Sequence, residues 1–149
     1  MFGRGLKLAV VGLVSLGSVG MAEVARADAW EEQVRAQLAI AGMAAVARGF
    51  ELTHSPFLGS LPHNTREDVT LNLRAGVSYA IIAVCDEDCT DLDLELYDPQ
   101  GRLVDSDYEP ADIAGVVVRP TASGRYRVRV LMSSCVDSPC RYGIGAFGN

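Results

Sequence analysis

In DLDLELYD, residues 91–98, a leucine stands at every second position from 92 to 96, and the residues between are acidic or aromatic. Successive side chains of a β-strand point to opposite faces, so this alternation predicts a strand with one buried and one solvated face. The stretch RYRVRVLM, residues 125–132, alternates in the same way and carries arginines on its polar side. Both stretches are therefore expected to be strands whose apolar sides contribute to one core.

The same pattern continues on either side of these two stretches. Short apolar runs are separated by turn sequences such as DPQG, residues 98–101, and ASG, residues 122–124. Seven or eight strands at this spacing predict a mainly β protein, an antiparallel jelly-roll-like β-sandwich. The run VSYAIIAVC, residues 77–85, is apolar on both faces, which favours a central strand that is covered on both sides.

An amphipathic α-helix is expected before the sandwich, over residues 28–49. Asp28 followed by Glu31 has the form of a capping box, and Gly49 is a natural C-terminal stop. The apolar residues at helical spacing are Trp30, Val34, Leu38, Ala41 and Ala45. This stripe is interpreted as a packing face, so the helix could cover one side of the sandwich.

The first 27 residues have the pattern of a signal peptide. Arg4 and Lys7 precede an apolar run over residues 8–20, and ARA at residues 25–27 offers a cleavage site after Ala27. The alternative is an uncleaved anchor, but the run is shorter than the roughly 18 residues that a membrane span needs. We therefore expect an exported protein, periplasmic or extracellular, without a membrane span after cleavage. Its parts would be a signal peptide (1–27), a helix (28–49) and a β-sandwich (50–149).

The chain is acidic, which restricts the classes of partner. Its 149 residues carry a formal net charge of −6, and removal of the leader, with three basic residues and one acidic residue, changes this charge to −8. Nucleic-acid binding needs clustered positive charge, so nucleic acid is excluded as a partner. The part of the chain after Ala27 contains no lysine.

Four cysteines occur in two close pairs, CDEDC at residues 85–89 and CVDSPC at residues 135–140. An even number of cysteines in an exported protein predicts disulfides. The local pairs Cys85–Cys89 and Cys135–Cys140 are preferred because each couplet flanks one short loop, while a crossed pattern such as Cys85–Cys135 stays open. Zinc is disfavoured, because the spacing does not suit it and an oxidising compartment removes thiolates.

If the two strands that open this section are neighbours, their polar faces carry opposite charge. Cross-strand pairs of opposite charge stabilise a sheet modestly. The sequence therefore predicts a solvent-facing charge ladder, made of Asp93, Glu95, Arg127 and Arg129.

Three segments carry a family resemblance: LNLRAGVSYAIIAV (71–84), DLDLELYDPQGRLV (91–104) and ASGRYRVRV (122–130). In this order they resemble the bacterial pre-peptidase C-terminal domain family, over residues 68–147. The resemblance implies a β-sandwich that accompanies secreted peptidases and other exported enzymes. Related modules bind calcium or insoluble substrates such as collagen. This chain departs from the pattern in its preceding helix and in its cysteines at two loops.

The acidic loop is a candidate calcium site. Carboxylate oxygens suit calcium, which takes six to eight oxygen ligands. The resemblance implies that Asp88, Asp91 and Asp93 are ligands; Asp86 adjoins them, and Asp137 could join if both cysteine loops lie at the same end. The alternative is a solvated acidic loop, since so many close carboxylates repel one another.

No catalytic arrangement stands out. His54 and His63 both lie in the irregular stretch THSPFLGSLPHNT, residues 53–65, and no G-x-S-x-G motif is present. We therefore expect a small non-catalytic module that binds a protein or polysaccharide partner in the periplasm or cell envelope, with calcium as a candidate stabilising ion. The alternative is a purely structural assembly domain held by its disulfides, and a small hydrolase is the least favoured.

Overall fold

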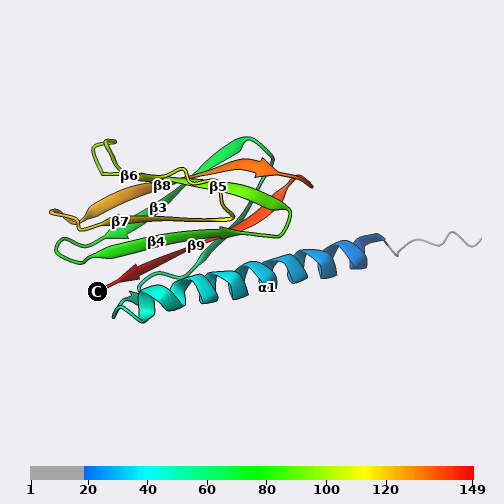
Figure 1. The fold of residues 1–149 in the computed structure, drawn as a ribbon, viewed down its shortest axis with the longest axis horizontal. Helices are drawn as coiled ribbons and strands as arrows, with labels where there is room; N and C mark the ends of the chain where they lie inside the picture. Colours follow the sequence, from blue (N-terminus) through cyan, green and yellow to red (C-terminus); the bar gives the residue numbers. More distant parts are fainter. Residues whose placement is uncertain (1–18) are drawn as a thin grey trace, which may run out of the picture.

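Two antiparallel β-sheets pack face to face in the computed structural model, which describes residues 19–149 and their side chains from residue 29 onward (Figure 1). One sheet contains β1 (Glu51–Leu52), β2 (Phe57–Leu61), β4 (Tyr79–Cys85), β7 (Ile113–Val118) and β9 (Cys140–Gly148). The other contains β3 (Thr65–Leu73), β5 (Cys89–Tyr97), β6 (Leu103–Asp107) and β8 (Gly124–Cys135), in the order β3-β8-β5-β6. The predicted β-sandwich preceded by a helix is confirmed.

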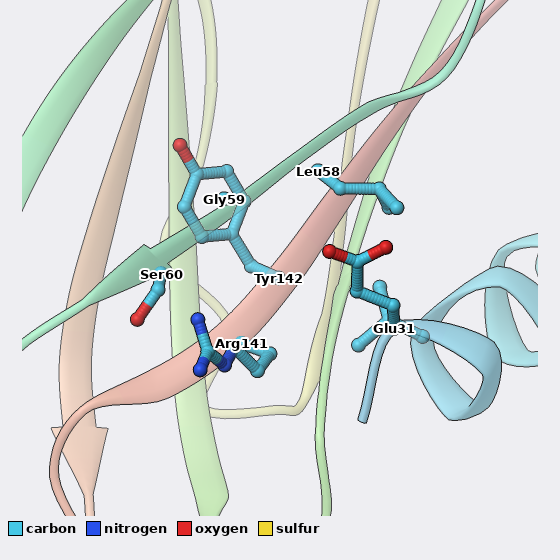
Figure 2. Close-up of a pocket in the computed structure, with 7 residues that line it drawn as sticks. Glu31, Leu58, Gly59, Ser60, Arg141 and Tyr142 are labelled. Carbon is cyan, nitrogen blue, oxygen red and sulfur yellow. The ribbon is translucent and has the colours of Figure 1, made fainter. Parts of the chain in front are cut away.

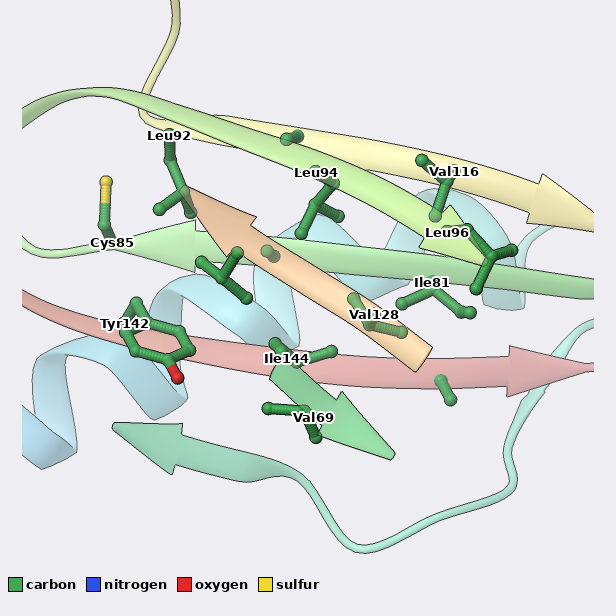
Figure 3. Close-up of a cluster of buried hydrophobic side chains, with 14 of the residues drawn as sticks. Val69, Ile81, Cys85, Leu92, Leu94, Leu96, Val116, Val128, Tyr142 and Ile144 are labelled. Atoms are coloured by element: carbon green, nitrogen blue, oxygen red, sulfur yellow. The ribbon is translucent and has the colours of Figure 1, made fainter. Parts of the chain in front are cut away.

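The core lies between the two sheets. Leu92, Leu94 and Leu96 of β5 are fully buried there, as the alternation of DLDLELYD predicts. The other sheet contributes Ile81 and Tyr142, among others, to the same cluster (Figure 3). β5 and β8 are neighbours, so the apolar sides of both strands face this cluster.

The helix α1 (Val19–Val46) begins earlier than the sequence predicts. It runs continuously through Asp28, so this residue does not stand at the N-terminus of the helix and the expected capping box does not form. Residues before Asp28, including alanine, methionine, glutamate and arginine, are good helix formers, which lets the helix continue in that direction. The predicted signal peptide lies largely outside the described residues, and its cleavage stays a prediction.

The helix ends close to the predicted stop. After Val46 the chain makes a turn, and Gly49 has a φ of 86°, in the left-handed region that glycine adopts without steric cost. The amide of Phe50 donates a hydrogen bond to the carbonyl of Ala45 over 3.1 Å. This turn reverses the chain into β1. In the described part of the chain, no helix is both long and apolar enough to cross a membrane.

α1 packs on the outer face of the sheet that contains β4 and β9. Val34 and Leu38 are buried against Val84, which explains why β4 is apolar on both faces. Two glycines of β9 let the helix approach closely. A Cβ atom at Gly143 would lie 2.8 Å from Cγ1 of Val34, and one at Gly145 would lie 3.3 Å from Cδ1 of Leu38. The helix therefore forms a third layer over part of the sandwich.

One short strand, β2, lies in the stretch 53–65 that was expected to be irregular, and β1 lies just before this stretch. β1 and β2 both pair with β9, and Pro56 stands just before β2. Their local sequence gives a weak strand signal because β1 has only two residues and proline interrupts the run. Pairing with β9, far along the chain, is what makes these segments strands.

Candidate functional site

A hollow of about 200 Å³ lies at one end of the sandwich, where two loops meet α1. One loop joins β4 to β5, the other joins β8 to β9, and each is closed by a disulfide. The residues that line the hollow are Trp30, Asp86, Asp88, Asp137, Ser138, Pro139 and Arg141. Three of the five predicted calcium ligands therefore meet in one place.

The disulfides join the local pairs Cys85–Cys89 and Cys135–Cys140, and no free cysteine remains in the described residues. Cys89 lies opposite Cys135 in the β5–β8 register, so the two bridges stand beside each other. Backbone hydrogen bonds join the loops: the amide of Val136 donates to the carbonyl of Asp88 over 2.8 Å. The loops around the hollow are thus held together by both covalent and hydrogen bonds.

Asp86 is the most deeply placed carboxylate of the hollow, with only 3% of its surface exposed. Its Oδ2 accepts a hydrogen bond from the backbone amide of Arg141 over 2.7 Å, while its Oδ1 is buried without a partner. Burial raises the pKa of Asp86, the hydrogen bond from the Arg141 amide opposes this rise, and repulsion from Asp88 adds to it. The amide of Asp88 and the positive charge of Arg141 also lower the pKa of Asp86, but burial outweighs them and the environment disfavours the charged form of this carboxylate.

Arg141 also lines a second, smaller hollow of about 120 Å³ beside the first, together with Glu31, Ser60 and Tyr142 (Figure 2). Tyr142 is fully buried, and its hydroxyl donates to Oε2 of Glu67 across the sandwich. Burial, and then this hydrogen bond, raise the pKa of the Tyr142 hydroxyl. The tyrosine anchors β9 to β3, which fixes the strand from which Arg141 projects.

Asp91 and Asp93 do not line the hollow. They lie on β5, where Asp93 accepts a hydrogen bond from the hydroxyl of Ser133, and each keeps a buried Oδ1 without a partner. Burial raises the pKa of Asp91, and the nearby charge of Asp93 raises it further. The structure thus divides the predicted calcium ligands between two places. Among residues 19–149, no three acidic, histidine or cysteine side chains gather closely enough to hold a metal ion.

The predicted charge ladder needs one correction. Asp93 lies opposite Leu131 and not opposite an arginine, because the register that places Glu95 opposite Arg129 continues without a shift to Asp93. Glu95 does lie opposite Arg129, with 3.8 Å between Oε2 and Nη1. The other ion pairs of the two arginines join β8 to β3, the neighbour of β8 on the side away from β5.

Asp68 of β3 takes the place that was predicted for Asp93. Its carboxylate accepts hydrogen bonds from Arg129 over 2.8 Å and from Arg127 over 2.8 Å. The hydrogen bond from Arg129 and the neighbouring positive charge hold the pKa of Asp68 at about 2. Sequence reasoning missed Asp68 because β3 and β8 are far apart in the chain and their register is a tertiary feature.

Glu95 lies at the centre of the other polar contacts on the outer face of β5 and β8. It accepts hydrogen bonds from the hydroxyls of Tyr97 over 2.5 Å and of Tyr108 over 2.8 Å, and the guanidinium of Arg127 lies 4.2 Å from the centre of the Tyr97 ring. Burial raises the pKa of Glu95, but these hydrogen bonds outweigh it and the net shift is downward. The charges of this face satisfy one another, so it is interpreted as a stabilised surface of the sheet.

Both histidines are engaged in hydrogen bonds with their surroundings. Nε2 of His54 lies 3.0 Å from the carbonyl of Asn72, and its Nδ1 lies 2.8 Å from the hydroxyl of Thr53. Nδ1 of His63 accepts a hydrogen bond from the amide of Cys135 over 3.1 Å. Asn72 and Cys135 belong to β3 and β8, so these contacts hold the segments on either side of β2 against the β3-β8-β5-β6 sheet.

Comparison with known proteins identifies no family for this chain. No protein-family model matches the chain, and no curated protein matches it. The resemblance to the pre-peptidase C-terminal domain family therefore stays a prediction. Among solved structures, the chain is similar to PliG of Aeromonas hydrophila, a periplasmic lysozyme inhibitor of g-type lysozyme. The identity is 14%, the match covers 64% of this chain and 85% of that one, and the TM-score is 0.46.

Four residues of the hollow were not predicted as site residues: Trp30, Ser138, Pro139 and Arg141. Trp30 was assigned to the packing stripe of the helix, yet it is only half-buried and lines the hollow. Arg141 directly follows Cys140, so the local disulfide was the one signal that could place it beside the acidic loop.

Proposed function

We propose that the protein is an exported, non-catalytic module that binds a protein or polysaccharide partner in the periplasm or cell envelope. The observation that carries this proposal is the hollow between the two disulfide-closed loops. It offers several carboxylates on loops that are already fixed, and a preformed site loses less conformational entropy on binding than a flexible one. The leader sequence supports export, and the hydrogen bonds of His54 and His63 give both imidazoles a structural role.

The test uses the purified, oxidised protein with isolated peptidoglycan and other envelope polysaccharides, and with envelope proteins by crosslinking. We expect saturable binding to one class of partner. Binding should weaken as salt rises, because the Debye length falls from about 8 Å at physiological ionic strength to about 3 Å at 1 M. Hydrolysis of an ester, peptide or glycoside that His54→Ala or His63→Ala abolishes would contradict the proposal.

A structural assembly domain is the second candidate, and one observation favours it. The exposed face of α1 carries Ile40, Met43 and Val46, all largely exposed apolar side chains. Self-association that increases with protein concentration, and that Met43→Asp abolishes, would favour this candidate over partner binding. Sedimentation velocity of the two proteins makes the comparison.

Calcium stabilisation is proposed at Asp91 and Asp93, whose unpartnered oxygens suit a cation. Two carboxylates supply fewer than six to eight ligands, so water and backbone carbonyls would complete the shell and binding would be weak. We expect millimolar calcium to stabilise the fold by on the order of 1 kcal/mol relative to excess EDTA, a rise of a few degrees in Tm.

Thermal unfolding followed by circular dichroism measures this effect. The double variant Asp91→Asn, Asp93→Asn should lose it, while Asp86→Asn, in the hollow, should keep it. Superimposed curves with calcium and with EDTA would exclude the site at that concentration.

A further inference from the structure

The carboxylates of the hollow have no paired cation of their own. Asp86, Asp88 and Asp137 face one arginine, Arg141, which forms no ion pair with the described residues. The ion pairs found among residues 19–149 lie elsewhere, on the turn after β5 and on the outer face of the β3-β8-β5 sheet. With three aspartates and one arginine in its lining, the hollow therefore keeps a net negative charge, which Arg141 offsets only in part.

A second observation is independent of this charge. Asp86 is almost fully buried, yet its Oδ1 lacks a hydrogen-bond partner, although buried carboxylate oxygens in proteins are normally paired. The oxygen belongs to a residue of the hollow's wall, beside Asp88 and Asp137. A positively charged group that enters the hollow would offset the repulsion between Asp86 and Asp88 and so favour the charged form of the buried carboxylate.

The shape and composition of the hollow favour an organic cation over a metal ion. The three aspartates do not converge in the way that a metal requires. Trp30 forms part of the wall, and the face of an indole attracts ammonium and guanidinium groups. A long side chain that ends in such a group can place its charge near Asp86 and its methylenes along the indole.

We propose that this hollow binds a lysine or arginine side chain of a basic protein partner. The inference rests on the proposed binding function and specifies the chemistry of the contact. Once the predicted leader with Lys7 is removed, the chain has no lysine, so a lysine ligand would then come from another protein, whereas an arginine could also come from a second copy.

Tryptophan fluorescence can measure binding in this hollow, because Trp30, in its wall, is the single tryptophan of the chain. Trp30 fluorescence of the purified, oxidised protein is titrated with a tetralysine peptide, a tetra-arginine peptide and, as a neutral control, tetra-acetyllysine. We expect saturable changes with the two basic peptides and none with the acetylated one. Asp86→Asn should raise the Kd for tetralysine at least tenfold.

Two further variants complete the test, one as a matched control and one as a substitute for Asp86→Asn. Glu109→Gln removes the same charge from an exposed position outside the hollow, so its Kd should change less than twofold. Asp137→Asn, at an exposed position of the hollow, should raise the Kd about threefold and serves if Asp86→Asn fails to fold. Equal binding of the acetylated peptide, or equal loss with Glu109→Gln, would overturn the proposal.

Calcium chloride forms the last arm of the titration. If calcium alone changes Trp30 fluorescence and displaces tetralysine in simple competition, the hollow is a metal site and the proposal is wrong. If envelope partners bind but basic peptides do not, the inference fails and the proposed binding function stands. If neither binds, both fail.

Discussion

Replacing Leu94 with alanine should lower the free energy of unfolding by about 3–4 kcal/mol. Leu94 has no exposed surface and lies in the middle of β5, packed in the core between the two sheets. The substitution removes buried methyl and methylene groups and leaves a cavity that close-packed neighbours cannot fill. For a domain of this size, Tm should fall by about 10 °C or more.

Leu103→Ala is the matched control. Leu103 lies on β6, the strand next to β5, and 51% of its surface is exposed. The same chemical change there should cost less than about 1 kcal/mol. Urea unfolding of both variants, followed by circular dichroism, measures the difference. Equal losses for the two variants would show that β5 does not occupy the centre of the core.

The local periodicity of the sequence was sufficient to predict the sandwich. Alternation of period two is a property of each strand alone, so DLDLELYD and RYRVRVLM identify their buried faces without knowledge of their partners. Leu94 and Val130 are accordingly buried in the same cluster. The run over residues 77–85 was correctly interpreted as covered on both sides, since α1 and the core lie on opposite faces of β4.

Features that depend on pairing over long distances could not be predicted in the same way. Arg127 and Arg129 proved to share a partner that was not predicted, Asp68, because the register of β3 against β8 brings it there. The start of α1 was missed for a different reason. Asp28 resembles a cap, but the preceding residues also favour helix, and the backbone continues through it.

Of all the features of the structure, the hollow was the one that the sequence predicted least completely. The acidic loop was recognisable from its composition, but its meeting with the CVDSPC loop depends on the pairing of β5 with β8. The contribution of Trp30 depends on how α1 crosses β9, which Gly143 and Gly145 permit. A set of five aspartates in sequence thus becomes three in the hollow and two on β5.

The attachment of α1 should depend on Leu38. This side chain is 4% exposed and packs in the cluster formed by Val34 and Val84. Leu38→Asp places a carboxylate in that cluster, where it would be desolvated beside apolar groups. We expect a loss of about 3–5 kcal/mol at neutral pH, or separation of the helix from the sheet, because an unpaired buried charge is among the most costly changes.

The pH dependence of this loss has a definite sign. Burial raises the pKa of the introduced carboxyl group in the folded state above its value in the unfolded state. The penalty is therefore full at neutral pH and shrinks as pH falls through the folded-state pKa, since protonation removes the charge. A loss that stays the same from pH 7 to pH 4 would point to altered packing as the cause.

Ile40→Asp provides the control on the same helix. Ile40 is 69% exposed, so the same carboxylate remains hydrated there and should cost less than about 1 kcal/mol. Urea unfolding followed at 222 nm gives the global stability, and Trp30 fluorescence reports whether α1 leaves the sheet before the sandwich unfolds. If Leu38→Asp and Ile40→Asp gave the same two curves, the helix would not be held by its buried face. The hollow, with Trp30 in its wall, would then lack a fixed boundary on that side.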